Sequence, residues 1–146
     1  MKIFFDTSVL VDLERGRDET IRLLEACQTA GHELWISAVT VSEIFTGAYL
    51  RTDADKAANR AREALGQFQW RDVDGEVAVA TGQILAFLVA HGKRIEYQDC
   101  VIGASCLVET GDRLVTENDV HFRLIPALGD RVLTTKEALK AFARKA

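Results

Sequence analysis

Short apolar segments alternate with helical segments along this chain, and this alternation limits the folds that it can adopt. The first of them, Lys2–Phe5, is an apolar and aromatic run without turn residues, which predicts a buried strand. Apolar residues at helical spacing follow it, beginning at Val9. Strands that alternate with helices in this way predict an α/β sandwich built on a parallel sheet. We expect the further strands at 33–37, 69–73, 113–116 and 132–133.

The helices between these strands are predicted from apolar spacing and from residues that favour helix ends. Asp74 is typical of a helix N-cap, and Thr134 and Glu137 have the spacing of a capping box. The most polar of these segments, 53–68, is expected on the outside of the fold. The other predicted helices are 18–27 with Ile21, Leu24 and Cys27 on its buried stripe, 39–49, 74–91, 99–108 and a final helix from Thr134.

The length of 146 residues fits a single domain over residues 1–146, which is large enough for a hydrophobic core. The apolar N-terminal run is interrupted by Asp6 and Asp12, so it is too short for a signal peptide. No other segment approaches the about 18 uninterrupted apolar residues that a membrane span needs. We therefore expect a cytoplasmic protein that does not enter a membrane.

Charge and cysteine content narrow the function further. A formal net charge of −4 argues against a protein that coats nucleic acid non-specifically, although it allows a nucleic acid held by local basic patches and a divalent metal. Cys27, Cys100 and Cys106 are odd in number and form no C-x-x-C motif. We interpret all three as small buried apolar residues.

Isolated acidic residues recur where strands end or helices begin. Asp6 ends the first strand, Glu43 interrupts a helix face of small and apolar residues, and Asp99 begins the most apolar helix of the chain. A fourth polar group, Asn118 or Asp119, follows a later strand. In open α/β sheets, ligands bind in the crevice beyond the carboxyl ends of the strands, so these residues are candidates for one site.

A simpler interpretation exists for the first of these positions. Asp6 or Thr7 is also a suitable N-cap for the helix that follows, because both side chains accept hydrogen bonds from the N–H groups of a first helical turn. The recurrence of acids at similar junctions favours a shared site over a series of unrelated caps.

Gathered carboxylates favour one kind of chemistry. Two of them about 4 Å apart repel by about 4 kcal/mol at an effective dielectric of about 20, so three in one crevice need protons or cations. Oxygen ligands without histidine or cysteine suit Mg²⁺ or Mn²⁺. Such a site suits phosphodiester hydrolysis, because a metal ion lowers the pKa of an attacking water and neutralises charge on the phosphate.

Other enzyme classes fit the sequence less well. His32, His91 and His121 lack the spacing of a zinc site, and we interpret each as a surface or loop residue. Neither G-x-x-x-x-G-K-[ST] nor G-x-G-x-x-G occurs, which disfavours the usual nucleotide-binding folds. An aspartyl-phosphate phosphatase would need a second aspartate where this chain has Ser8.

Four motifs, in this order along the chain, resemble those of the PIN-domain ribonucleases, and most of all those of the VapC toxins of toxin–antitoxin pairs. Single motifs of this family are weak, but four in the right order over nearly the whole chain are fairly specific. The motifs are Asp6-Thr7-Ser8-Val9-Leu10, Val41-Ser42-Glu43-Ile44, Asp99-Cys100-Val101-Ile102-Gly103-Ala104, and Leu114-Val115-Thr116-Glu117-Asn118 with Phe122.

This resemblance implies a three-layer α/β/α sandwich that cleaves RNA endonucleolytically with Mg²⁺ or Mn²⁺. It also implies a homodimer and inhibition by a cognate antitoxin whose tail enters the acidic groove. By the same resemblance, Asp6, Glu43 and Asp99 are the metal ligands, and Thr7 or Ser8 orients the first of them.

The chain departs from the family at the fourth acidic position. That position falls on Asn118, where many members have Asp, so the charge of the site is lower by one and a second metal is in question. Whether Asn118 or the neighbouring Asp119 fills the position stays open. Two other functions also stay open: a catalytically degenerate RNA-binding or scaffolding module, and a nuclease that acts on DNA.

Overall fold

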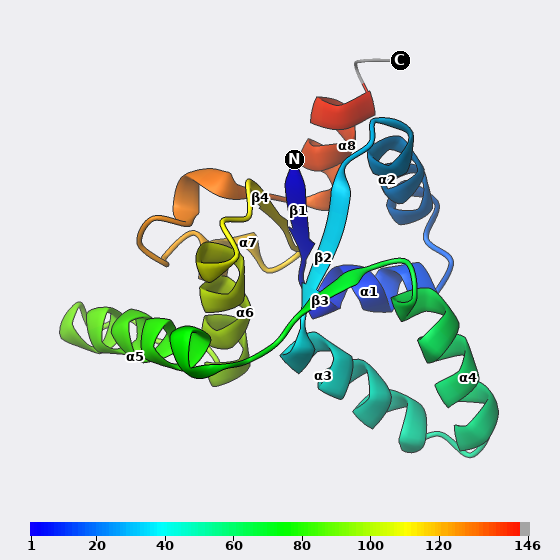
Figure 1. Cartoon of the computed structure of the whole chain (residues 1–146), viewed down its shortest axis with the longest axis horizontal. Helices are drawn as coiled ribbons and strands as arrows, with labels where there is room; N and C mark the ends of the chain where they lie inside the picture. Colours follow the sequence, from blue (N-terminus) through cyan, green and yellow to red (C-terminus); the bar gives the residue numbers. More distant parts are fainter. Residues whose placement is uncertain (144–146) are drawn as a thin grey trace.

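The structure is a computed structural model that describes residues 1–143, and its centre is a five-stranded sheet (Figure 1). All strand pairs are parallel, which confirms the predicted parallel sheet. The short segment after residue 68 is an edge strand. In spatial order, the strands are β3 (Gln69–Arg71), β2 (Glu33–Ser37), β1 (Lys2–Phe5), β4 (Arg113–Val115) and β5 (Val132–Leu133).

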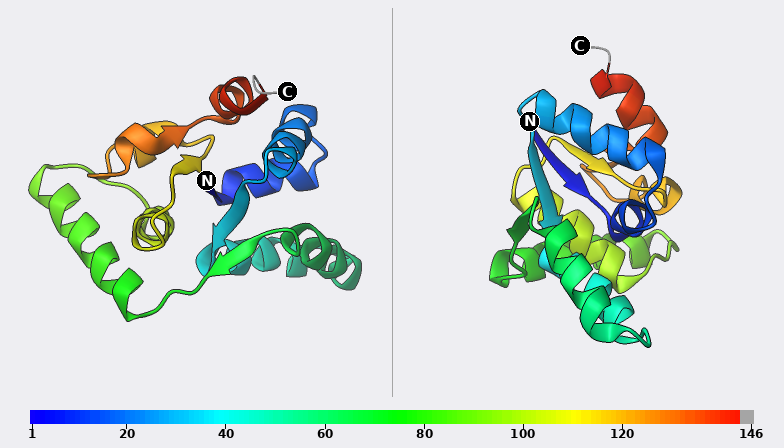
Figure 2. Two further views of the ribbon diagram at one scale, coloured as in Figure 1. Left: turned by 45° about the horizontal axis from the view of Figure 1, so that its top comes forward. Right: turned by 90° about the vertical axis from the view of Figure 1, so that its right-hand side faces the viewer.

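Helices cover both faces of the sheet, so the fold is the expected three-layer α/β/α sandwich (Figures 1 and 2). One layer contains α1 (Thr7–Glu14), α2 (Asp18–Thr29), α3 (Ala38–Tyr49), α4 (Ala54–Leu65) and α8 (Thr135–Phe142). The other contains α5 (Gly75–Ala90), α6 (Tyr97–Val108) and the short α7 (Asp119–Phe122), followed by a 3₁₀ turn at Gly129–Arg131.

Strand β1 separates the two hydrophobic cores. Successive side chains of a strand point to opposite faces, so Ile3 and Phe5 enter the core under α1 to α4, while Phe4 enters the core under α5 and α6. All three are fully buried. A strand buried on both faces needs an uninterrupted apolar sequence, which explains the composition of this segment.

The strand order reverses direction at β1. The chain first builds outward from β1 to β2 and β3, and then returns to the other side of β1 to add β4 and β5. Such a reversal leaves a crevice at the carboxyl ends of the two strands beside it, here β1 and β4. Asp6 follows β1 and Thr116 follows β4, so both lie at this crevice.

The predicted helix starts are confirmed where capping residues were recognised. The Asp74 carboxylate accepts a hydrogen bond from the Val77 backbone N–H at 3.1 Å, which caps α5. Thr134 and Glu137 form the predicted capping box at the start of α8.

The predicted buried stripe of the helix at 18–27 is partly wrong. Leu24 and Cys27 are buried as predicted, but Ile21 is 37% exposed and Thr20 is buried in its place. Helix α2 packs against both α8 and β2, and this double contact turns its buried face toward the Thr20 side.

All three cysteines are buried, as predicted, and burial raises the pKa of the Cys27 and Cys100 thiols to about 11. The thiols of Cys27 and Cys100 therefore stay protonated at neutral pH. Within the described part of the chain, no helix is both long enough and apolar enough to cross a membrane.

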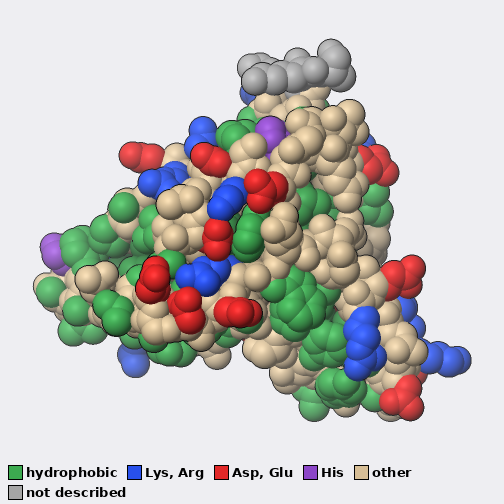
Figure 3. Space-filling view, viewed as in Figure 1, with side chains coloured by type: hydrophobic (Ala, Val, Ile, Leu, Met, Phe, Trp, Pro, Cys, Tyr) green, Lys and Arg blue, Asp and Glu red, His purple; other side chains and the backbone are tan. Residues whose placement is uncertain are grey.

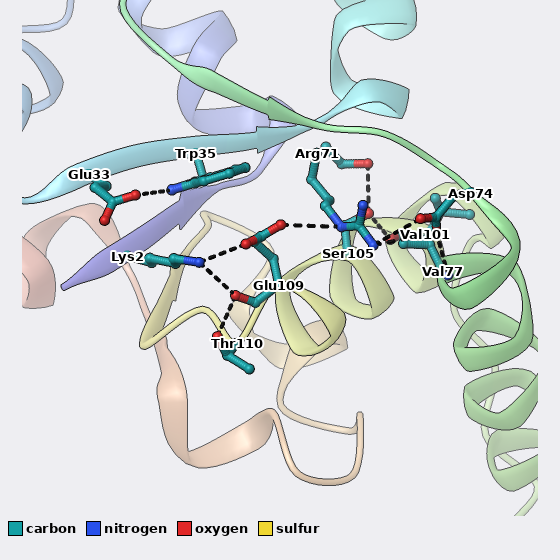
Figure 4. A network of polar contacts seen from close by, with 11 residues as sticks. Lys2, Glu33, Trp35, Arg71, Asp74, Val77, Val101, Ser105, Glu109 and Thr110 are labelled. Atoms are coloured by element: carbon teal, nitrogen blue, oxygen red, sulfur yellow. Dashed lines mark hydrogen bonds and ion pairs between the residues drawn. The ribbon is translucent and has the colours of Figure 1, made fainter.

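A charged network ties α6 to the start of β1 and to the end of β3. Acidic and basic side chains intermingle in a band across the face of the molecule in Figure 3. Within this network, Glu109 Oε2 lies 2.6 Å from Lys2 Nζ, and Glu109 Oε1 lies 3.4 Å from Arg71 Nε (Figure 4). Arg71 also pairs with Asp74 at 3.2 Å. Each carboxylate of this network therefore has a basic partner.

Candidate active site

Asp6 lies directly after β1, and its side chain is held by two hydroxyl groups. Ser8 Oγ donates to Asp6 Oδ2 at 2.8 Å, and Thr116 Oγ1 donates to the same oxygen at 2.7 Å. Asp6 is 2% exposed, yet its side chain makes no capping hydrogen bond to α1. Asp6 therefore occupies the N-cap position of α1 but does not cap the helix with its side chain, and its carboxylate is oriented instead by Ser8 of α1 and by Thr116 after β4.

The direction of both hydroxyl protons follows from the neighbouring backbone. The Glu117 N–H donates to Ser8 Oγ at 3.1 Å, and the Asn118 N–H donates to Thr116 Oγ1 at 2.9 Å. A hydroxyl has one proton, so each of these groups accepts from the backbone and gives its own proton to Asp6. Both donors meet Oδ2, which fixes the carboxylate and leaves Oδ1 for a ligand.

Glu43 is brought to the same place by α3. Thr7 Oγ1 donates to Glu43 Oε1 at 2.7 Å, and it lies 3.0 Å from the buried Thr40 Oγ1. Because Thr7 has one proton to donate, Thr40 is the donor in the second contact. Thr7 is adjacent to Asp6 in the chain, so the same turn orients both carboxylates. Ser8 orients Asp6 and Thr7 orients Glu43, which refines the expected role of these two residues.

Asp99 lies in the first turn of α6 and completes the acidic group. The pKa of its carboxyl is raised to about 6, mainly by burial and in addition by the negative charges of Asp6 and Glu43. His121 acts in the opposite direction. The three acids predicted to act together are thus close enough for their charges to interact, although they come from three separate elements.

His121 is a member of this site that sequence reasoning missed. Its Nδ1 lies 3.8 Å from Asp99 Oδ2, and its side chain is 51% exposed. It was expected at the surface or in a loop, and it is exposed, but it stands on α7 directly beside the acids. The available signal was its place in the polar run that follows β4, since residues after strands of this sheet face the crevice.

The fourth predicted position lies next to the groups that hold Asp6. Asn118 is exposed at the N-cap of α7, and its backbone N–H supports Thr116. Asp119 forms an ion pair with Arg123, 3.2 Å between Oδ2 and Nε. The alternative ligand Asp119 therefore already has a cationic partner.

The donor set fits a hard divalent cation. Within residues 1–143, no group of three or more Asp, Glu, His or Cys side chains is already arranged as a metal site. However, the carboxylates of Asp6, Glu43 and Asp99 are the oxygen ligands that Mg²⁺ and Mn²⁺ prefer. Their mutual repulsion, which acts on the pKa of Asp99, is the kind of interaction that a bound cation relieves.

Comparisons with known families and solved structures concern the fold as a whole. The family model described as the PIN domain matches residues 3–128. Among curated proteins, none matches this sequence significantly.

Several solved structures share the fold. The chain is similar to one in the crystal structure of VapBC2 from Rickettsia felis bound to a DNA fragment from its promoter, with a TM-score of 0.83 and 20% identity. It is also similar to one in DNA-bound VapBC from Salmonella typhimurium, with a TM-score of 0.81 and 21% identity. A toxin–antitoxin complex from Klebsiella pneumoniae gives a TM-score of 0.70 and 25% identity. Each of the three comparisons covers 92% of this chain and 98% of the other.

Proposed function

Since this chain belongs to the PIN domain family, we propose that it is the toxin of a toxin–antitoxin pair and cleaves RNA by metal-dependent hydrolysis in the cytoplasm. The observation that carries the proposal is the convergence of Asp6, Glu43 and Asp99, with the charges of the first two acting on the pKa of the third. A scaffolding domain has no need of three acids held together at this cost.

In the proposed reaction, Asp6, Glu43 and Asp99 hold Mg²⁺ or Mn²⁺. When bound, the metal ion lowers the pKa of an attacking water and neutralises charge that develops on the phosphate. The chain itself supplies orientation. Ser8 and Thr116 fix Asp6, and Thr7 fixes Glu43, so two of the three carboxylates are set before the substrate arrives.

Asn118 is the proposed fourth member of the site. Its amide oxygen is a neutral ligand, directly or through water, at a position where many family members have a carboxylate. The ion pair with Arg123 favours a structural role for Asp119.

Two protein partners belong to the proposal. The printed names of the similar VapBC structures describe toxin–antitoxin complexes, which supports a cognate antitoxin for this chain. A second copy of the chain is proposed on α5, because Val79, Phe87 and Val89 of that helix expose large apolar side chains. Light scattering of Val79→Glu, compared with the unmodified chain, tests this homodimer.

The nuclease activity is tested with purified protein, single-stranded RNA and Mn²⁺. Asp6→Asn keeps the size of the side chain and removes its charge, so cleavage should fall by about 100-fold or more. Asp18→Asn, on the exposed surface of α2, is the matched control and should cleave normally. Thermal unfolding of both variants then checks that the fold is kept.

Three outcomes separate the candidate functions. Cleavage of RNA that depends on Asp6 supports the proposal, whereas equal cleavage by the unmodified chain and Asp6→Asn removes this site from the mechanism. Binding of RNA without any cleavage in Mn²⁺ or Mg²⁺ favours the scaffolding alternative. Faster cleavage of single-stranded DNA than of RNA assigns the site to DNA.

A further inference from the structure

A cleft of about 480 Å³ opens beside the acidic site and is lined by residues of α1, α3 and α4. Glu43 lines one part of this cleft and is also a member of the acidic group, so the two are continuous. Arginines from two parts of the chain line the remainder: Arg15 just after α1, and Arg51 and Arg60 around α4. A nucleic-acid strand bound at the acids would therefore have these three arginines beside it.

Two of these arginines are held in place by one carboxylate. Arg51 Nε lies 3.0 Å from Asp53 Oδ1, and Arg60 Nη2 lies 3.3 Å from Asp53 Oδ2. The two guanidinium groups hold the pKa of Asp53 below its usual range. Each guanidinium has five N–H donors and uses one in these ion pairs, so both keep donors for another anion.

Charged side chains line this cleft together with small and apolar residues. Gly47 and Ala57 contribute almost no side chain there, and a Cβ atom added at Gly47 would have no neighbour within 4 Å. A second acid, Glu14, also lines the cleft, and burial raises the pKa of its carboxyl while Arg60 and Arg51 oppose that rise. Apart from Glu43, which belongs to the acidic group, three arginines stand against two carboxylates here, Glu14 in the cleft and Asp53 paired with Arg51 and Arg60, in a chain whose net charge is −4.

We propose that this cleft binds the phosphate backbone of the RNA strand beside the cleaved bond, with Arg51 and Arg60 as the main phosphate contacts and Arg15 as a further one. The inference rests on the proposed nuclease function and adds the path of its substrate. Guanidinium groups match phosphate oxygens with two parallel hydrogen bonds, and a pair of them fixed by Asp53 loses little conformational entropy on binding.

The experiment uses the salt dependence of RNA binding, which counts phosphate contacts. For single strands, the slope of log K against log salt changes by about 0.7 for each phosphate that is neutralised. The full chain carrying Asp6→Asn binds a fluorescent single-stranded RNA without cutting it, and anisotropy gives K at several salt concentrations. Arg51→Gln and Arg60→Gln are each expected to make this slope shallower by about 0.7 and to weaken binding at low salt.

Arg62→Gln is the matched control, since Arg62 lies on the same helix but outside the cleft. Its guanidinium lies 5.4 Å from the Phe45 ring centre and donates to the Tyr49 hydroxyl at 3.3 Å. The slope should not change in this variant. In the cleavage-competent chain, Arg51→Gln should raise KM and leave kcat nearly unchanged, because a contact made equally in the ground and transition states contributes only to binding.

The possible results separate this inference from the function on which it rests. If RNA binds and is cleaved but Arg51→Gln and Arg60→Gln keep the original slope, the inference is overturned and the nuclease function stands. The same unchanged slopes with a weakened complex between the chain and its co-expressed antitoxin assign the cleft to a protein partner, which also overturns it. If the unmodified chain neither binds nor cleaves RNA in Mn²⁺, both proposals fail.

Discussion

Strand β1 and helix α6 lie close together at both of their ends, and the two ends differ in how their charges are balanced. At one end, Lys2 at the start of β1 lies 2.6 Å from Glu109 at the end of α6 (Figure 4). At the other end, Asp6 follows β1 and Asp99 begins α6, and the charge of Asp6 raises the pKa of Asp99. The same two elements therefore form a balanced ion pair at one edge of the sheet and a repulsive pair at the other.

This difference distinguishes charged residues that stabilise the fold from charged residues that form a candidate active site. The region of Lys2, Arg71 and Glu109 satisfies its charges internally, so it contributes to holding α6 and β3 on the sheet. At the acidic edge, which Asp6, Glu43 and Asp99 form, the mostly buried Asp99 has the half-exposed His121 as a basic neighbour at 3.8 Å, and yet burial and the neighbouring acids raise its pKa. Carboxylates left unbalanced in a crevice indicate a cation or a proton as the missing partner.

The largest expected effect comes from removing the charge of Asp99 in metal-free protein. A folded-state pKa raised from 3.8 to about 6 means that the folded protein keeps a proton that the unfolded chain releases, so stability falls as the pH rises through this window. Asp99→Asn removes this loss and should stabilise the metal-free protein at pH 7 by about 2–3 kcal/mol, at about 1.4 kcal/mol per pKa unit.

Urea unfolding in a chelating buffer between pH 3.5 and pH 7.5 measures this effect. The gain in the free energy of unfolding of Asp99→Asn over the unmodified chain should be absent below about pH 4, where Asp99 is protonated in the folded and the unfolded state. The gain should be complete above about pH 6. Asp18→Asn, the exposed control on α2, should show no such window. A variant less stable than the unmodified chain at pH 7 would contradict the repulsive character of the acidic edge.

At the balanced edge, the opposite sign is expected. Glu109→Gln removes the carboxylate that faces Arg71, which is only 17% exposed, and should lower the free energy of unfolding by about 1–2 kcal/mol, the size of a hydrogen bond to a charged group. RNA cleavage should be retained. Glu25→Gln on the exposed side of α2 provides the comparison, and a Glu109→Gln variant as stable as this control would show that the network contributes nothing.

The fold was largely predictable because the information for it is local. Alternating strand and helix patterns, the Asp74 cap and the Thr134 capping box are each encoded within a few residues, and all were confirmed. The buried stripe of α2 was predicted less well, with Ile21 exposed, because its orientation depends on α8, which lies more than 100 residues further along the chain.

The site was predictable only in part, because its contacts join residues that are far apart in the sequence. The sequence suggested Asp6, but it did not exclude a helix cap, since the deciding hydrogen bond comes from Thr116, 110 residues away. The place of His121 after β4 pointed to the crevice, but its contact with Asp99 depends on how α7 packs against α6. Residues that act through the tertiary structure are not visible in local patterns.

The smallest expected effect concerns the fourth position. Asn118→Asp adds one negative charge to the acidic edge, which should tighten Mn²⁺ binding by roughly tenfold, because cation affinity rises with the charge of the ligands. Asp119→Ala should leave the affinity nearly unchanged, since Arg123 already pairs with Asp119. Calorimetric titration of Mn²⁺ into both variants compares them, and the reverse ranking would identify Asp119 as the ligand.

The central claim, that Asp6, Glu43 and Asp99 await a shared cation, is tested most directly by thermal unfolding during a Mn²⁺ titration of the unmodified chain and Asp99→Asn. A ligand that binds only the folded state raises Tm with its concentration, by about 2.7 kcal/mol of stability at a hundred times Kd. We predict a clear rise of Tm in the unmodified chain and a much smaller rise in Asp99→Asn, which starts from a higher metal-free Tm at pH 7. Equal rises in both proteins, or no rise in either, would contradict the claim.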